Sequence, residues 1–326
     1  MQNRRNFLRA SGALMLGGLG SLMLPGCNTK DAKTTSETDS TDSTATANTS
    51  QNTPAAAIPA AGLQLYTVRE LLDKDLKGTL QKIADIGYKN MEAAAGAKGH
   101  YYGLKPKEFA SMLDGMGMKV RSNHVLVGGQ AKEEAPLPDS LQTLNNNMQQ
   151  LVDMAAEAGQ SYLVCAFLFP SERKTIDQYK KYAELFNKTG EACKKAGLTF
   201  AYHNHDFEFQ KIDNQVPYDI LLNETDKDLV KMELDLYWAE KSGNDPVALF
   251  QKHQGRFPLW HVKDMDNTDK KFFTEVGNGT IDFKPIFEAA QTAGMEYYFV
   301  EQDVTPGNPI DSITTSFKNL PKFLPA

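Results

Sequence analysis

Residues 192–205 read ACKKAGLTFAYHNH and contain a complete transition from a helix to a strand. An apolar pattern at helical spacing stops at Gly197, and the β-prone run LTFAYH follows at once. Glycine readily takes the left-handed backbone conformation that often ends a helix. Because no long loop separates the two elements, the stretch predicts a helix–glycine–strand unit. Such units in series predict parallel strands that are joined by right-handed crossovers.

The same unit recurs in residues 80–94, 109–125, 154–167 and 289–302. The predicted strands are 62–67, 88–93, 119–124, 161–167, 198–203, 231–236, 259–264 and 297–302. Eight β/α units in about 270 residues predict a (β/α)8 TIM barrel. The alternative is a doubly wound open sheet, which usually has about five or six strands. No G-x-G-x-x-G or Walker-type loop follows a predicted strand, so a nucleotide-binding fold has no support.

The first residues predict export and say nothing about the fold. NRRNFLRASG (3–12) contains a twin arginine, and the apolar stretch 13–26 follows it. This pattern is typical of a Tat-like signal, and the apolar run is too short and glycine-rich for a stable spanning helix. LPGC (24–27) resembles a lipobox in which Cys27 is acylated. The alternative is a frayed apolar N-terminus with a stray cysteine.

Three segments are therefore predicted: a lipoprotein signal peptide (1–26), a disordered Ser/Thr-rich tether (27–57) and one catalytic domain (58–326). The tether composition cannot bury enough apolar area to offset its chain entropy. The protein is expected to be exported and lipid-anchored in the cell envelope, on the periplasmic or outer-membrane face. Besides Cys27, two cysteines remain, Cys165 and Cys193; this number excludes a small disulfide-stapled fold, and both are expected to be inert core residues.

The charge balance excludes one class of partner. The chain has 35 basic and 41 acidic residues, and loss of residues 1–26 would remove three arginines, which leaves a net charge near −9. An acidic domain repels phosphate backbones, which argues against nucleic acid. We expect a small-molecule ligand, contact with a membrane only through the lipid anchor, and an oligomeric state that the sequence leaves open.

Polar side chains gather at the C-terminal ends of the predicted strands, where barrels of this kind carry their chemistry. They are Gln64, Tyr66, Arg69, Glu92, Asn123, His124, His203, Asn204, His205, Glu233, Asp235, His261, Lys263, Asp264, Glu301, Gln302 and Asp303. Because burial of unpaired charge is costly, we expect some of them to surround a cation. Asp, Glu and neutral His are suitable ligands for Mn²⁺, Zn²⁺, Co²⁺ or Mg²⁺.

Each of these residues alone has a plainer interpretation. A histidine at a strand end is often a hydrogen-bonded packing residue, and Asp235 would suit a helix N-cap. Glu233 points to the same side of its strand as Asp235, because side chains alternate with a period of two. We expect only one of these two carboxylates to be a ligand, and we favour Asp235 because it lies nearer the mouth of the barrel.

Four phrases carry a resemblance to a known family. They are YHNHDFEF (202–209), ELDLYWAEKSGNDP (233–246), HVKDMD (261–266) and EVGNGTIDFKPIFEAAQTAGMEYYFVEQD (275–303). Together they resemble the xylose isomerase-like TIM barrels, the sugar isomerase/epimerase superfamily that also contains endonuclease IV. The resemblance covers about residues 60–324.

The resemblance implies one divalent metal that is held by a Glu, an Asp, a His and a second Glu. Asp235, His261 and Glu301 match the last three positions. The first position is His203, which departs from the family pattern, so His205 or Glu208 is an alternative fourth ligand. A second departure is Trp238, which stands where many relatives have a substrate-contacting His.

The resemblance also implies roles around the metal. Glu301 or His205 would be the base, and Lys263 would present its ammonium to a substrate oxygen. Glu92, His124, Glu208 and Trp238 would contact the substrate, with Trp238 stacking on a sugar ring or an aglycone; its alternative is a core position.

The predicted reaction is metal-assisted removal of a proton next to a carbonyl, followed by isomerisation or epimerisation of a non-phosphorylated sugar or keto-sugar. Loss of a β-substituent instead would make the enzyme a 3-keto-glycoside lyase or hydrolase. The sequence also leaves open a lipid-anchored sugar-binding protein without catalysis, a DNA-repair nuclease, and a glycosidase that uses Glu233 and Glu301. Acidic charge opposes the nuclease, and His261 has no role in the glycosidase.

Overall fold

The computed structural model describes residues 58–96, 98–128, 138 and 141–325. The predicted signal peptide (1–26), the tether (27–57) and the lipidation site Cys27 lie outside the described residues and stay predictions. Within the described ranges, no helix has the length and apolar character needed to cross a membrane.

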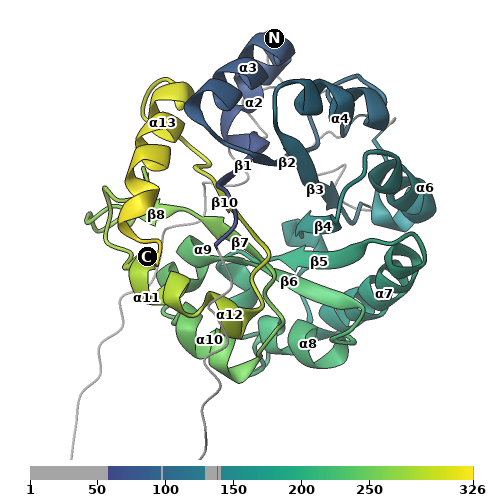
Figure 1. The fold of residues 1–326 in the computed structure, drawn as a ribbon. Helices are drawn as coiled ribbons and strands as arrows, with labels where there is room; N and C mark the ends of the chain where they lie inside the picture. The colour runs from purple at the N-terminus through teal and green to yellow at the C-terminus, as the bar shows by residue number, and fades with distance from the viewer. Residues whose placement is uncertain (1–57, 97, 129–137, 139–140, 326) are drawn as a thin grey trace, which may run out of the picture. The chain divides into compact units, whose positions relative to one another are not determined.

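Eight parallel strands close into a barrel in the order β1-β10-β7-β6-β5-β4-β3-β2, which confirms the predicted fold (Figure 1). They are β1 (Gly62–Gln64), β2 (Asn90–Ala94), β3 (Lys119–Leu126), β4 (Tyr162–Phe167), β5 (Thr199–His203), β6 (Val230–Asp235), β7 (Leu259–Val262) and β10 (Tyr297–Val300). A two-stranded antiparallel pair, β8 (Asp264–Met265) and β9 (Phe273–Thr274), follows β7.

Helices surround the barrel and connect its strands (Figure 1). The α-helices are α2 (Arg69–Lys74), α3 (Leu76–Ile86), α4 (Pro106–Gly115), α6 (Leu144–Glu157), α7 (Ile176–Lys195), α8 (Pro217–Glu224), α9 (Leu236–Lys241), α10 (Pro246–Lys252), α11 (Phe283–Glu288), α12 (Ala290–Ala293) and α13 (Pro309–Asn319). The 3₁₀ helices are η1 (Leu65–Val68), η2 (Pro170–Glu172), η3 (Phe207–Phe209) and η4 (Leu320–Lys322).

The glycine that ends the quoted stretch behaves as predicted. Gly197 follows α7 with a φ of 76° and leads into β5 two residues later. A side chain at this φ would strain the backbone, whereas glycine turns the chain from the helix into the strand without cost. Where the helix–glycine–strand pattern occurs, it marks the point at which the strand begins.

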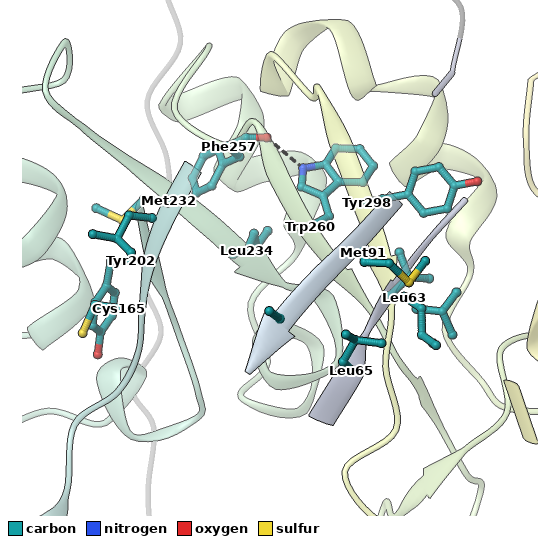
Figure 2. Close-up of a cluster of buried hydrophobic side chains, with 14 of the residues drawn as sticks. Leu63, Leu65, Met91, Cys165, Tyr202, Met232, Leu234, Phe257, Trp260 and Tyr298 are labelled. Carbon is teal, nitrogen blue, oxygen red and sulfur yellow. Dashed lines mark hydrogen bonds between the residues drawn. The ribbon is translucent and has the colours of Figure 1, made fainter. Parts of the chain in front are cut away.

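Strand alternation gives the barrel an apolar outer face and, at the C-terminal ends of several strands, polar side chains on the inner face. Figure 2 shows Tyr202, Leu234 and Trp260 in the buried cluster of hydrophobic side chains, with the Trp260 indole Nε1 donating to the Phe257 carbonyl. Each of these three residues is followed or preceded by a polar one that must point into the barrel. Cys165 lies in the same cluster; it and Cys193 are free and buried, as expected for core residues, and burial raises the pKa of both thiols.

Apolar side chains fill one layer of the barrel interior. They form a cluster of their own, made of Tyr162, Val164, Ala201, Leu259 and Phe299. Two residues further along β5, β7 and β10, the inward positions become polar. The barrel interior is therefore filled by apolar side chains in this layer and becomes polar at the C-terminal ends of the strands. This change positions the candidate site.

The predicted strand 259–264 ends earlier than expected, at Val262. Asp264 belongs instead to β8, where its carboxylate accepts hydrogen bonds from the backbone amides of Met265, Gly277, Gly279 and Ile281 at 2.8–3.2 Å. A Cβ at Gly279 would collide with Asp264 Oδ1, so this close approach requires glycine. Residues 276–281 (VGNGTI) therefore fold around Asp264 and hold this residue in place directly after Lys263.

Candidate metal centre and active site

Four neighbouring strands bring metal-binding side chains together. His203 ends β5, Asp235 ends β6 and pairs in register with His261 of β7, and Glu301 follows β10 directly. One donor atom from each of the four residues lies within 4.8 Å of the others, and all four residues are buried. We call His203, Asp235, His261 and Glu301 the Asp235 group. This is the predicted ligand set, including the histidine at the first position.

The hydrogen bonds of His203 show that this group fits a cation. His203 Nδ1 lies 3.1 Å from the Ala166 carbonyl oxygen, so this nitrogen donates. Burial, with help from His261, His124 and Lys263, holds the pKa of His203 well below its usual value. The neutral ring therefore points an unprotonated Nε2 at Asp235 Oδ2, 3.2 Å away. Two acceptors face each other at the spacing of two ligands on one metal.

The carboxylate of Asp235 is also held by its own helix. Its Oδ1 accepts a hydrogen bond of 3.0 Å from the Trp238 amide and caps α9. The N-cap interpretation and the ligand interpretation are therefore compatible, because Oδ2 remains directed at the other donors. The Asn204 side chain fixes the Asp235 backbone amide from the neighbouring strand.

Lys263 supplies a positive charge to the same place. Its ammonium lies 2.8 Å from Asp235 Oδ2, 2.7 Å from Glu301 Oε2 and 2.8 Å from Asp303 Oδ1. Burial opposes the charge, but the three carboxylates hold the pKa of Lys263 well above its usual value. In turn, Lys263 and His261 overcome the burial of Glu301 and keep its pKa below the ordinary value. A divalent metal in the Asp235 group would compete with this ammonium for two carboxylates.

A second set of donors lies on the other side of His261. His124 Nε2 is 3.1 Å from Glu92 Oε1 and 2.7 Å from Glu233 Oε2. His261 Nε2 is 2.6 Å from Glu92 Oε1 and 3.3 Å from Glu233 Oε2. We call Glu92, His124, Glu233 and His261 the Glu233 group. Their donor atoms also lie within 4.8 Å of one another, and burial with the nearby Glu92 charge raises the pKa of Glu233 to about 7.

Glu92 does not lie as predicted for a substrate contact. The residue is 0% exposed, and its carboxylate accepts hydrogen bonds from Gln64 Nε2 at 2.7 Å and from Ser122 Oγ at 2.5 Å. With His261 and His124 on the same carboxylate, its acceptor positions are taken by the protein itself. His124 is nearer to the expected place, because 11% of its side chain is exposed.

Glu208 also differs from its predicted roles as substrate contact or fourth ligand. Its carboxylate accepts hydrogen bonds from the Tyr202 hydroxyl and from the His205 backbone amide, at 2.5 and 2.8 Å. Tyr202 points outward from β5, where its ring lies 5.3 Å from that of Phe186 in α7. Glu208 therefore lies on the helix side of the strand, opposite to the inward face of His203.

Burial raises the pKa of Glu208 to about 7 in the folded protein, against an ordinary value of 4.5. The folded state thus binds this proton more tightly, and its stabilising effect is lost as the pH rises from about 4.5 to 7. The shift corresponds to at most about 3 kcal/mol. We expect Glu208→Gln to make the free energy of unfolding less dependent on pH between 5 and 8.5, as measured by urea denaturation. An unchanged pH dependence would contradict this assignment.

His205 and Trp238 lie together in an aromatic cluster beside the Asp235 group. The His205 ring stacks on Phe207 and lies 5.5 Å from Trp238, with Phe167 edge-on at 4.9 Å. Its ring centroid is 4.8 Å from that of His203. Burial, followed by the neighbouring His203 and Lys263 side chains, holds the pKa of His205 well below its usual value, so the imidazole is neutral. Trp238 is 8% exposed, which fits a wall of the site as well as a core position.

The sequence does not identify the role of every residue that meets these groups. Ser122 stands two residues before His124 and therefore on the same face of β3, a period-two signal that could have found it. Asp303 is recognisable in the sequence only as a polar residue at a strand end, yet it binds Lys263. Glu233, which the sequence does not favour as a ligand, lies in contact with His124 in the Glu233 group.

Known proteins show similar sequences and folds. The curated inosose dehydratase of Lacticaseibacillus casei is 30% identical over 156 residues, which cover 42% of this chain and 52% of that protein. The chain thus spans about half the length of the curated relatives it matches. A crystal structure of a sugar phosphate isomerase/epimerase from Parabacteroides distasonis is 28% identical, with a TM-score of 0.66, and the match covers 82% of this chain and 95% of that one.

A crystal structure of the IolI protein with a binding zinc atom has a TM-score of 0.63, covering 82% of this chain and 98% of that one. Its 14% identity shows a shared fold alone. Residues 80–320 match the family model described as xylose isomerase-like TIM barrel. This range includes the whole Asp235 group. The chain belongs to the xylose isomerase-like TIM-barrel family.

Proposed function

We propose that this protein is a divalent-metal-dependent sugar isomerase or epimerase that acts through an enediolate. The observation that carries the proposal is the Asp235 group, in which the unprotonated His203 Nε2 faces the Asp235 carboxylate at 3.2 Å. A divalent metal held by these four residues would supply Lewis-acid polarisation of a substrate carbonyl. The names of the relatives, an inosose dehydratase and a sugar phosphate isomerase/epimerase, support a reaction of this class.

The remaining steps belong to side chains of this chain. Glu301 is ionised, and in our proposal its carboxylate takes the proton next to the carbonyl. Lys263 lies 2.7 Å from the same carboxylate, so its ammonium can donate to the substrate oxygen that gains charge. His205 is the alternative base, since its imidazole is neutral and its Nδ1 is buried without a protein partner among the described residues.

A second reaction follows from the same intermediate. If a substituent on the neighbouring carbon leaves before the proton returns, the enzyme is a lyase, such as a 3-keto-glycoside lyase. The inosose dehydratases favour this candidate, because a dehydratase expels water in such a step. Lys263 would then protonate the leaving group, and His205 and Trp238 would border an aglycone.

The proposed substrate is a non-phosphorylated sugar or keto-sugar. Arg69, a cation at the mouth, already has protein partners, because its guanidinium donates to the Tyr66 and Asp303 carbonyls. An exported, lipid-anchored enzyme, which residues 1–27 lead us to propose, would also meet glycosides more often than sugar phosphates.

The test starts from the full chain after chelation and reloading with Mn²⁺, Co²⁺, Zn²⁺ or Mg²⁺. We expect about one catalytic metal per chain and metal-dependent exchange of deuterium from D₂O into a keto-sugar, measured by mass spectrometry. The panel includes free sugars, 3-keto-glycosides and sugar phosphates. Exchange together with a new isomer, separated by chromatography, indicates epimerisation or isomerisation, and a released aglycone indicates a lyase.

Two results would contradict the proposal. A protein that binds no divalent metal after reloading has no Lewis acid for this reaction. A protein that binds metal and sugar, yet exchanges no deuterium with any member of the panel and releases no aglycone, would be a lipid-anchored sugar-binding protein, which is the non-catalytic alternative.

A further inference from the structure

His261 belongs to both donor groups, and its two ring nitrogens face different carboxylates. Nδ1 lies 2.8 Å from Glu301 Oε2 and 3.7 Å from Asp235 Oδ2. Nε2 lies 2.6 Å from Glu92 Oε1 and 3.3 Å from Glu233 Oε2. Because an imidazole normally binds a metal through one nitrogen, the two groups compete for this residue.

The surroundings of Glu92 decide which nitrogen keeps its hydrogen. Glu92 Oε1 already accepts from the Gln64 amide at 2.7 Å, and Oε2 accepts from Ser122 at 2.5 Å. A carboxylate that is held by donors from β1 and β3 is fixed as an acceptor, and its shortest contact to His261 is the 2.6 Å hydrogen bond at Nε2. Nε2 therefore donates, and Nδ1 is the nitrogen that can be released for a metal.

The two imidazoles of the Glu233 group each have a short hydrogen-bond partner, although Glu233 Oε1 has none among the described residues. His124 Nε2 makes its shortest contact with Glu233 at 2.7 Å, and His261 Nε2 makes its shortest with Glu92 at 2.6 Å. Each imidazole thus has one short partner, as expected for one hydrogen per nitrogen. In the Asp235 group, by contrast, His203 Nε2 carries no hydrogen, so it cannot donate a hydrogen bond to Asp235.

We propose that Glu92 is a positioning residue for the metal ligand His261, and that the Glu233 group is the hydrogen-bonded support of the metal centre. Glu92 fixes the His261 tautomer and the direction of Nδ1, and its charge makes the imidazole a stronger ligand. Gln64 and Ser122 hold Glu92, while His124 and Glu233 close the network. This inference rests on the metal site of the proposed function and assigns no contact with substrate to Glu92.

The first experiment needs no variant of Glu92. Full-length protein with ¹⁵N-labelled histidine is loaded with Zn²⁺, and the nitrogen chemical shifts of the imidazoles are measured. We expect His261, assigned by loss of its signals in His261→Gln, to show a protonated Nε2 and a metal-bound Nδ1. Two zinc ions per chain with both His261 nitrogens unprotonated would overturn the inference, because the Glu233 group would then be a second metal site.

The second experiment compares two buried glutamates. Glu92→Gln keeps the size of the side chain and removes the charge that faces His261. Glu172→Gln is the control, because Glu172 is 3% exposed, its carboxylate accepts from the Phe169 amide, and it belongs to neither donor group. Removal of an outer hydrogen-bond partner typically costs about 10- to 100-fold in metal affinity. We expect Glu92→Gln to raise the dissociation constant for Co²⁺ by this factor, measured by competition with a chelator, and Glu172→Gln to change it less than about twofold.

The outcomes separate this inference from the proposed function. Equal Co²⁺ affinity in wild type, Glu92→Gln and Glu172→Gln would overturn the role of Glu92 while the metal site stands. Weaker binding in Glu92→Gln with an altered Co²⁺ visible spectrum supports the role, even if no sugar exchanges deuterium. Circular dichroism checks that both variants are folded, and if Glu92→Gln is not, the ¹⁵N measurement on wild type decides.

Discussion

Asp235→Asn is expected to lose the bound divalent metal and, with it, the deuterium exchange. Asparagine preserves the N-cap of α9, because its side-chain oxygen can accept from the Trp238 amide, so the local fold should persist. The variant removes the negative charge that faces both His203 and Lys263. Loss of a hydrogen-bond partner of a metal ligand typically costs up to about 100-fold in metal affinity. Because Asp235 is a proposed ligand itself, we expect Asp235→Asn to raise the dissociation constant for Mn²⁺ or Co²⁺ by more than this factor.

Asp282→Asn is the matched control, because Asp282 caps α11 in the same way through the Lys284 amide and belongs to neither donor group. It should keep metal binding and exchange near the wild-type values. Elemental analysis after dialysis and chelator competition provide the measurements. An Asp235→Asn protein with one metal per chain and unchanged affinity would remove Asp235 from the site.

Lys263→Met is expected to separate metal affinity from activity. Lys263 is 1% exposed, and its loss leaves three carboxylates without their ammonium. Removal of one partner from a buried ion pair typically lowers the free energy of unfolding by about 3–5 kcal/mol. We expect a loss of this size for Lys263→Met in the presence of a chelator. A divalent metal no longer competes with the ammonium, so it should bind more tightly and restore much of the stability. Exchange should nevertheless fall about 10²- to 10³-fold, because the donor to the developing oxyanion is absent.

The control for this variant is Lys252→Met. Lys252 pairs with Asp219 on the surface at 3.4 Å, with 63% of its side chain exposed, and its loss should cost less than about 1 kcal/mol. Thermal and urea unfolding, each with chelator and with Mn²⁺, provide the comparison. Lys263→Met with wild-type stability in chelator would show that the ammonium does not hold the three carboxylates, and unchanged exchange would exclude its catalytic role.

The fold was predictable because its signals are local. Several helices end where an apolar pattern meets a glycine such as Gly197, and the next strand starts within a few residues. The count of eight then selects a closed barrel. The hairpin of β8 and β9 was missed, because it depends on Asp264 and on amides of residues 277–281, which no local pattern within 259–264 reveals.

The candidate site was predictable in part for the same reason. Strand alternation and the family motifs place His203, Asp235, His261 and Glu301 at one end of the barrel, and the structure brings them together. The partner of each side chain was not predictable. Glu92 lies on an inward face, as its position in β2 indicates, but only the neighbouring strands show that Gln64, Ser122 and His261 occupy its oxygens. Glu208 lies on the helix side because it belongs to the 3₁₀ helix η3, where the alternation of a strand does not apply.

Closure of the barrel has a consequence for how the chain reaches its native state. Gly62 of β1 pairs with Phe299 of β10, so the first and last strands complete the sheet together. A chain interrupted before Tyr297 has two open edges, one on β1 and one on β7, and unpaired edges are templates for self-association. During synthesis the protein is therefore most vulnerable to aggregation until its final strand is available. Truncation of β10 should produce insoluble material instead of a smaller folded domain.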